Sequence, residues 1–149
     1  MSVLHLEKFG PAVDPTTRYT TAVVPVGTRN KSDDAEWLFV KAGGAITASG
    51  DPVSISTGGL SGAVRGDLDV GQCIGMAYSP FASGEYGYIQ TKGLTTMVVE
   101  SGAVAGGGLQ ISGTVGKLKA ITTSGTQIAV MNEASDDAGT ARKSVYLMC

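Results

Sequence analysis

The chain has 149 residues, 22 of them glycine, with 16% charged residues and a net charge of −2 at pH 7. A chain of this length buries about 70% of its unfolded surface, so we expect one hydrophobic core that needs no disulfide or metal. The net charge and the lack of a Lys and Arg cluster argue against binding to nucleic acid or to an anionic membrane. The charged fraction is below the roughly 25% of ordinary soluble domains, which predicts a surface packed against a partner or extensive backbone pairing.

Residues 1–31 are predicted to form an extended arm. Three of the five prolines lie there, at Pro11, Pro15 and Pro25. Residues 20–26 have the composition of a short strand, but Pro25 cannot donate a ladder hydrogen bond, so such a strand would belong at a sheet edge. The arm also carries basic residues that suit an acidic partner surface: Lys8, Arg18, Arg29 and Lys31.

The start of the chain lacks the continuous apolar core of a secretory signal, and no stretch approaches the length of a transmembrane helix. We therefore expect synthesis and folding in a cytosol. Cys73 and Cys149 belong to no local motif, which is most simply interpreted as two free thiols in a reducing compartment. A disulfide between them stays open at the level of sequence.

Residues 32–149 are predicted to form a single β domain. Ser32 is a suitable helix cap and is followed by acidic residues, so residues 32–36 are expected to form one helical turn. No helical period persists over eleven residues beyond that point. Instead, about nine short apolar runs at roughly 8–12 residue spacing predict an all-β sandwich or small barrel. The runs are 37–40, 52–56, 72–77, 86–90, 95–100, 108–112, 117–122, 127–131 and 143–148.

Two parts of this body resemble each other. Residues 37–46 align with residues 95–104 at an offset of about 58, and in both an apolar run leads into a Gly-Ala-aliphatic turn. The further matches are 53–56 with 109–112, 74–76 with 128–130, and 87–89 with 145–147. They indicate two duplicated halves, although any β chain rich in Gly, Ala, Val and Ser shows some self-similarity.

No group of residues forms a recognisable catalytic site. His5 is the only histidine, so a Ser-His-Asp triad, a Cys-His pair and a multi-histidine metal site are all absent. Residues 102–108 lack the Lys of a phosphate-binding loop and predict a turn. The carboxylates are assigned to solvated loops rather than to a metal site: Asp33, Asp34, Glu36, Asp67, Asp69, Glu133, Asp136 and Asp137. We expect neither enzymatic activity nor a bound cofactor or metal.

Trp37 and Phe39 alternate onto one face of their predicted strand. The preferred interpretation places both in the core of the β domain. The alternative makes Trp37 an anchor of a subunit interface, where aromatic side chains are enriched.

Several segments share a pattern of glycines, alanines and strand spacings. They are Gly75-Met76-Ala77, Ala82-Ser83-Gly84-Glu85, Ala103-Val104-Ala105-Gly106-Gly107-Gly108-Leu109 and Gly125-Thr126-Gln127-Ile128-Ala129-Val130. Over roughly the last two thirds of the chain this pattern resembles capsid decoration (cement) proteins of tailed bacteriophages. Two departures are Ala129, where the first half has Gly75, and the arm, which shorter members lack.

The resemblance implies a small β-barrel or sandwich that assembles, commonly as a homotrimer, on the outside of a capsid. We therefore expect a non-enzymatic virion protein whose partners are the major capsid protein and further copies of itself. The expected contact residues are Phe9, Arg18, Tyr19, Val24, Arg29 and Trp37. The alternative function is a carbohydrate-binding or adhesin-like module, in which Tyr78, Phe81 and Tyr86 would form a sugar-stacking platform.

Overall fold

The computed structural model describes residues 14–32, 34–56, 58–66, 72–133 and 141–149. These residues form strands and no helices, which confirms the all-β prediction. The described residues therefore include no helix with the length and hydropathy of a membrane span. The strands are β1 (Arg29–Lys31), β2 (Ala35–Lys41), β3 (Asp51–Ser56), β4 (Gly59–Arg65), β5 (Cys73–Ala77), β6 (Tyr86–Val99), β7 (Gly108–Ile111), β8 (Leu118–Ala120), β9 (Ala129–Met131) and β10 (Ala141–Met148).

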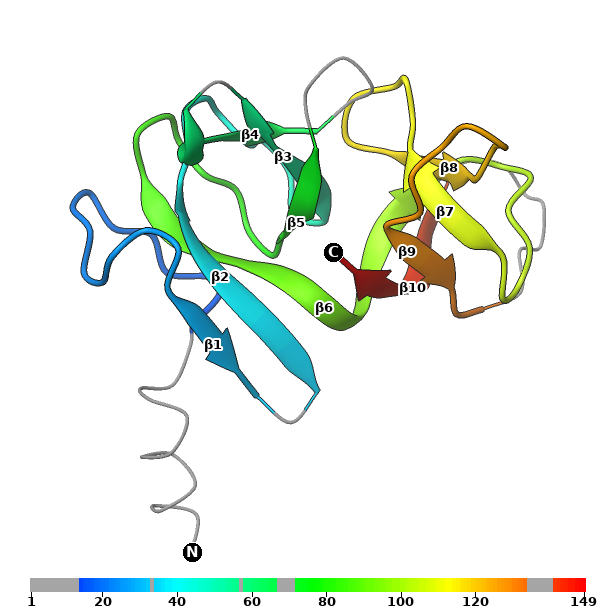
Figure 1. Cartoon of the computed structure of the whole chain (residues 1–149), viewed down its shortest axis with the longest axis horizontal. Helices are drawn as coiled ribbons and strands as arrows, with labels where there is room; N and C mark the ends of the chain where they lie inside the picture. The colour runs from blue at the N-terminus through cyan, green and yellow to red at the C-terminus, as the bar shows by residue number, and fades with distance from the viewer. Residues whose placement is uncertain (1–13, 33, 57, 67–71, 134–140) are drawn as a thin grey trace, which may run out of the picture.

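The chain folds into two small barrels that share the long strand β6 (Figure 1). The first barrel has the strand order β2-β6-β5-β3-β4, and its neighbouring strands are antiparallel. It closes between β4 and the end of β2 through a parallel bridge of Ala42 with Ala63, where Gly43 N donates to Ala63 O at 2.8 Å.

The second barrel repeats this scheme. Its order is β6-β10-β9-β7-β8, again antiparallel between neighbours. It closes through a parallel bridge of Val99 with Leu118, where Glu100 N donates to Leu118 O at 2.8 Å. In chain order, β6 is therefore the last strand of the first barrel and the first strand of the second.

Strand register confirms that the two halves repeat one scheme, and it bears out the middle matches of the predicted repeat. Val53 lies opposite Gly75 in the first barrel, and the matching residues Leu109 and Ala129 lie opposite each other in the second. The final match, 87–89 with 145–147, was wrong by two positions. Met76 pairs with Gln90 while its counterpart Val130 pairs with Tyr146, so Gln90 rather than Tyr88 corresponds to Tyr146.

The first match, 37–46 with 95–104, was wrong by one position. Trp37 pairs with Gln90 as Leu94 pairs with Tyr146, so Trp37 corresponds to Leu94. The bridges that close the two barrels agree, because they use Ala42 in the first and Val99 in the second.

β6 was predicted as two separate strands and is one strand. Its first part pairs with β2 and its last part with β10, and Lys92 and Gly93 pair with both. Gly93 has a φ of 111°, and a side chain there would collide with the carbonyl oxygen of Asp34. Glycine is therefore required where β6 passes from one barrel to the other.

The expectation of a single core was wrong, because each ring of short strands encloses its own apolar cluster. The first cluster contains Leu38, Val40, Ala42, Ile46, Val53, Ala63, Ala77, Phe81 and Ile89. The second contains Cys73, Met76, Met97, Val99, Ala103, Leu109, Ile111, Leu118, Ile128, Ala129, Met131, Val145 and Leu147. Cys73 and Met76 belong to β5 of the first barrel but pack with the second cluster, so they tie the two barrels together.

Strand β4 was not predicted, because its Gly- and Ser-rich sequence is typical of a loop. This composition has a packing reason. A Cβ on Gly43 would lie 2.8 Å from the Cα of Gly62, so the two backbones approach too closely for side chains where the first barrel closes.

The predicted helical turn at residues 32–36 was also wrong. Ser32 N donates to Ala35 O at 2.9 Å, and Ala35 begins β2, so the segment connects the antiparallel hairpin of β1 and β2. The expected end of the arm at residue 31 therefore lies inside a hairpin. Residues 20–26 form no strand; Thr28 N donates to Pro25 O at 3.1 Å in a turn.

Candidate contact surface

Arg18 fastens the segment before β1 to the first barrel. Its guanidinium donates to the carbonyl oxygens of Pro15, Thr17, Ser79 and Pro80 at 2.6–3.0 Å. Burial lowers the pKa of Arg18 to about 10, an effect that Glu85 and Asp14 oppose. Arg18 therefore stays charged at neutral pH, and its donors are used inside the protein rather than offered to a partner.

Tyr19 also attaches the segment before β1 to the first barrel. Its backbone forms an antiparallel bridge with Tyr86, and its ring packs against Phe39 with centroids 6.2 Å apart. Tyr86 and Tyr88 cover Phe39 as well, so Phe39 is fully buried outside the barrel.

Trp37 and Phe39 do share one face of β2, but that face points away from the barrel core. Leu38 and Val40 face the core instead. Trp37 is half-buried, with an edge contact to Tyr78 at 6.3 Å between ring centroids. The core placement preferred for Trp37 was therefore wrong, because alternation fixes a shared face without fixing its direction. Phe39 is fully buried, as predicted, but among aromatic side chains outside the ring of strands.

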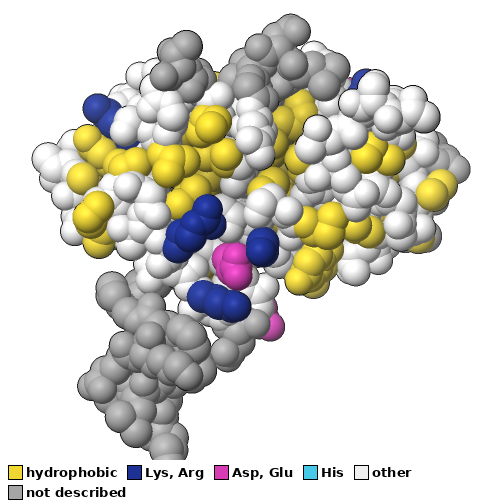
Figure 2. All heavy atoms as spheres, viewed as in Figure 1, with side chains coloured by type: hydrophobic (Ala, Val, Ile, Leu, Met, Phe, Trp, Pro, Cys, Tyr) yellow, Lys and Arg dark blue, Asp and Glu magenta, His cyan; other side chains and the backbone are white. Residues whose placement is uncertain are grey.

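Between Tyr19 and strand β1 the chain forms a loop of five apolar residues, 22–26, which we call the apolar loop. Ala22, Val23 and Pro25 are exposed, Val23 at 55%, while Val24 and Val26 are half-buried. The loop projects from the first barrel in Figure 1, and Figure 2 shows apolar side chains gathered on that side. Contiguous exposed apolar residues on a monomer mark interaction surfaces.

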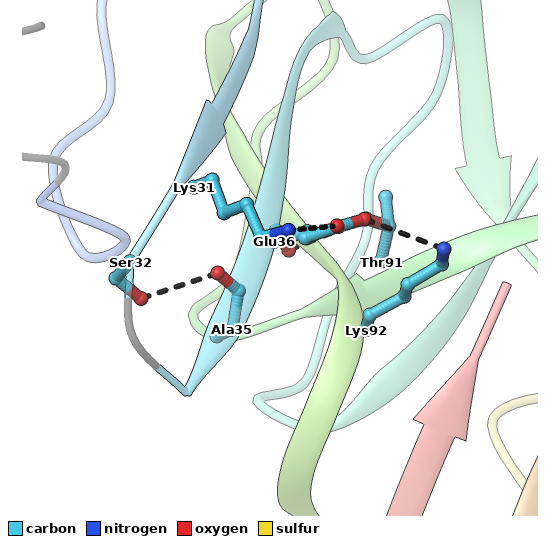
Figure 3. Close-up of polar contacts among 6 residues, drawn as sticks. All are labelled: Lys31, Ser32, Ala35, Glu36, Thr91 and Lys92. Carbon is cyan, nitrogen blue, oxygen red and sulfur yellow. Dashed lines mark hydrogen bonds and ion pairs between the residues drawn. The ribbon is translucent and has the colours of Figure 1, made fainter. Parts of the chain in front are cut away.

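Charged side chains surround Glu36 near the passage between the barrels (Figure 3). Lys31 Nζ lies 3.6 Å from Glu36 Oε1, and Lys92 Nζ lies 3.6 Å from Glu36 Oε2. Both lysines are largely exposed, so each ion pair contributes little to stability. Arg29 is exposed on β1, in the same hairpin as Lys31.

A second exposed apolar surface lies on the outer face of the second barrel. Leu94 on β6 pairs with Tyr146 on β10, and Tyr146 pairs with Val130 on β9. Leu94 is 57% exposed and Tyr146 51%, and Met148 on the same strand is also exposed. We call Leu94, Val130, Tyr146 and Met148 the outer stripe; Figure 2 shows apolar side chains where β9 and β10 lie.

Aromatic stacking on a sugar would need exposed rings, and one member of the predicted platform is not exposed. Phe81 is only 2% exposed and lies beneath the Arg18 guanidinium, with Arg18 Cζ 3.6 Å from the ring centroid. Tyr86 is half-buried and stacks on Phe39 at an interplanar angle of 15°. Only Tyr78 of the three is exposed, so the predicted platform is not assembled.

Residues 102–107 form turns, as predicted, and Gly108 is already the first residue of strand β7. Within the described residues no three His, Cys, Asp or Glu side chains lie close enough together to hold a metal ion. His5, Phe9, Asp33, Asp67, Asp69, Asp136 and Asp137 lie outside the described residues. Glu133 accepts a hydrogen bond from Ser144 N at 2.7 Å.

A groove of about 780 Å³ lies between residues of the two barrels. Gln72 and Cys73 of the first half line it, together with second-half residues that include Gln110, Lys119 and Cys149. The Sγ atoms of Cys73 and Cys149 are 3.9 Å apart in this groove. No motif in the sequence indicated this proximity, because the two cysteines lie 76 positions apart.

No family model and no curated protein matches the chain.

Proposed function

We propose that this chain is a decoration protein of a tailed bacteriophage capsid: a non-enzymatic virion protein that binds the capsid exterior and stabilises it. The observation that carries the proposal is the apolar loop, whose exposed residues are held in place at both ends. Arg18 and Tyr19 fasten the chain before it, and the β1–β2 hairpin fastens the chain after it. A fixed apolar projection can dock on a capsid surface without paying a large ordering cost.

The resemblance to cement proteins implies that the partner is a major capsid protein, and the two barrels are a suitable scaffold for such contacts. Ten strands in a chain with 16% charged residues give a protein whose surface suits burial in contacts more than free solution. Arg29 and Lys31 lie exposed on β1, where they can pair with acidic groups of the major capsid protein.

Binding to capsids stripped of this protein tests the proposal. Val23→Asp places a charge on the apolar loop and is expected to reduce cosedimentation with capsids at least tenfold. Val115→Asp is the matched control, because Val115 is 40% exposed but lies in the turn between β7 and β8. Equal binding by both variants, with unchanged circular dichroism, would argue against docking through the loop.

Capsid stabilisation is tested separately. A protein that binds only the assembled capsid stabilises it by mass action, so decorated particles should rupture at a higher temperature than stripped ones. Equal rupture temperatures would remove the cement function and favour the adhesin-like alternative.

We further propose self-association, most simply as a homotrimer, through the outer stripe. Leu94 and Tyr146 provide large exposed side chains on adjacent strands, which suits a cyclic contact between identical subunits. Light scattering on purified protein or on protein eluted from capsids should give three times the monomer mass. The Leu94→Glu, Tyr146→Glu double variant should give the monomer, whereas Val104→Glu, at a 64% exposed control site, should not.

A further inference from the structure

The two cysteines come from different barrels and meet at the groove. Cys73 is the first residue of β5, and Cys149 directly follows β10. Their backbones are fixed: Cys73 pairs with Ser54 on β3, and Cys149 N donates to Thr91 O at 2.9 Å. The Sγ atoms therefore meet at 3.9 Å because the fold holds both residues there.

We propose that this pair is an oxidisable thiol site, which a low-molecular-weight disulfide such as oxidised glutathione converts into an intramolecular disulfide across the two barrels. The inference does not rest on the proposed function. A disulfide needs an S–S separation of about 2 Å, so side-chain rotation must bring the sulfur atoms closer by roughly the length of one bond. The Sγ atoms make only weak contacts that such a rotation must break, with Gly75 O at 3.6 Å and Ile128 O at 3.9 Å.

The two thiols differ in access. Both line the groove, but Cys149 is partly exposed whereas Cys73 is buried, at 8% exposure. The groove also lets a small oxidant reach Cys149 past polar side chains such as Gln127 and Lys119. An oxidant therefore meets Cys149 first, and the second step happens inside the protein, out of reach of larger reagents.

The reaction balances as two exchange steps. The Cys149 thiolate attacks glutathione disulfide, forms a mixed disulfide and releases one glutathione thiolate, which takes up the proton lost by Cys149. The Cys73 thiolate then attacks Cys149 Sγ and releases the second glutathione. Two protein thiols are oxidised, and one glutathione disulfide is reduced to two thiols.

Electrostatics within the pair affects the rate of each step. The hydrogen bond between the thiols lowers the pKa of Cys73 and raises that of Cys149, and burial adds to the rise at Cys149. The attack of Cys149 on glutathione disulfide is therefore expected to be slow, because little Cys149 is present as thiolate. The neighbouring Cys73 thiolate is expected to attack the mixed disulfide faster than it forms, so little of it should accumulate.

The site is tested by incubating the purified full chain with oxidised glutathione and following its mass. The wild-type protein is expected to lose about 2 Da, to show no free thiol after denaturation, and to yield one peptide pair joining Cys73 to Cys149. Cys149→Ser is the matched control and must not lose this mass. The disulfide should raise the thermal midpoint of the wild type by on the order of 5 °C or more, because it closes a long loop in the unfolded chain.

Three results would overturn the proposal. The first is that both thiols remain free at a time when an exposed cysteine in a reference protein has fully oxidised. The second is a separate glutathione adduct on each cysteine. The third is a disulfide between two molecules of the protein. Reduction with dithiothreitol must restore both thiols and the original midpoint; failure to do so would assign the mass change to another oxidation.

Discussion

Arg65 and Asp51 form a partly buried ion pair within the first barrel, next to the second. Arg65 Nε lies 2.6 Å from Asp51 Oδ2, and Arg65 Nη2 donates to Asp51 Oδ1 at 3.2 Å. The Asp51 side chain is only 4% exposed, and its Oδ2 also accepts a hydrogen bond from Ala48 N at 3.1 Å. Gly116 of the second barrel packs against both charged groups with no room for a side chain.

Asp51→Asn should therefore be strongly destabilising, by about 3 kcal/mol, because it leaves the Arg65 charge without its partner in a mostly buried site. Urea unfolding measures the loss. The double variant Asp51→Asn, Arg65→Met should be more stable than the sum of the single changes implies, since the unpaired charge is then removed. A loss below about 1 kcal/mol for Asp51→Asn would contradict this account.

Arg18→Ala should lower the free energy of unfolding by about 2 kcal/mol. The change removes hydrogen bonds to four carbonyl groups and the cation–π contact with Phe81. It should also speed proteolytic cleavage between residues 14 and 28, because this segment loses its main side-chain anchor. Arg29→Ala removes a charge from an exposed site of the neighbouring hairpin and should change neither stability nor cleavage.

Gly93→Ala should destabilise the fold by about 3 kcal/mol or more, since a methyl group would meet the Asp34 carbonyl at a left-handed backbone conformation. Gly102→Ala separates the two causes: Gly102 has a φ of 96° but nothing within 4 Å of its added Cβ. It should cost about 1 kcal/mol through backbone strain alone. Similar losses for the two variants, by thermal or urea unfolding, would show that crowding at Gly93 is unimportant.

Asp14 should titrate well below an ordinary aspartate. Hydrogen bonds from the Thr16 hydroxyl and the Thr17 hydroxyl, both 2.7 Å, and from Thr16 N at 2.9 Å hold its pKa at about 2. The folded pKa is depressed, so the turn at residues 14–17 is stabilised above pH 4 and loses this contribution as the pH falls from about 4 to about 2.

Carboxyl NMR titration of Asp14 measures this pKa directly. Thr16→Ala should raise it toward 3.8, because Thr16 supplies the largest contribution. A value near 3.8 in the wild-type protein would show that these hydrogen bonds do not persist in solution.

The strand content and the repeat could be predicted from the sequence because both depend on local pattern. Apolar runs separated by Gly, Ser and Asp correctly predicted most strands, from β2 to β10. The match of Val53 with Leu109, and of Gly75 with Ala129, indicated a register that the pairing confirms. The composition of β4 gave no such signal, because its glycines serve a close backbone approach in the closed barrel.

The direction of each strand face and the meeting of distant residues were decided by tertiary structure. Alternation put Trp37 and Phe39 on one face, but only the packing of Tyr19, Tyr86 and Tyr88 made that face the outer one. The contact residues were also decided by tertiary structure. The sequence indicated basic and aromatic residues of the arm as contacts for a partner. In the structure Arg18 and Tyr19 bind within the protein, and Val23 is exposed instead.

By itself, then, the sequence determined that the chain is all-β and built from two related halves, since strand periodicity and turn composition act over a few residues. Only the tertiary structure decided that these halves close as two barrels with separate cores and share β6. It also decided that Cys73 and Cys149 lie side by side. Ring closure and such contacts depend on which backbones can approach across many residues, and no local pattern encodes that choice.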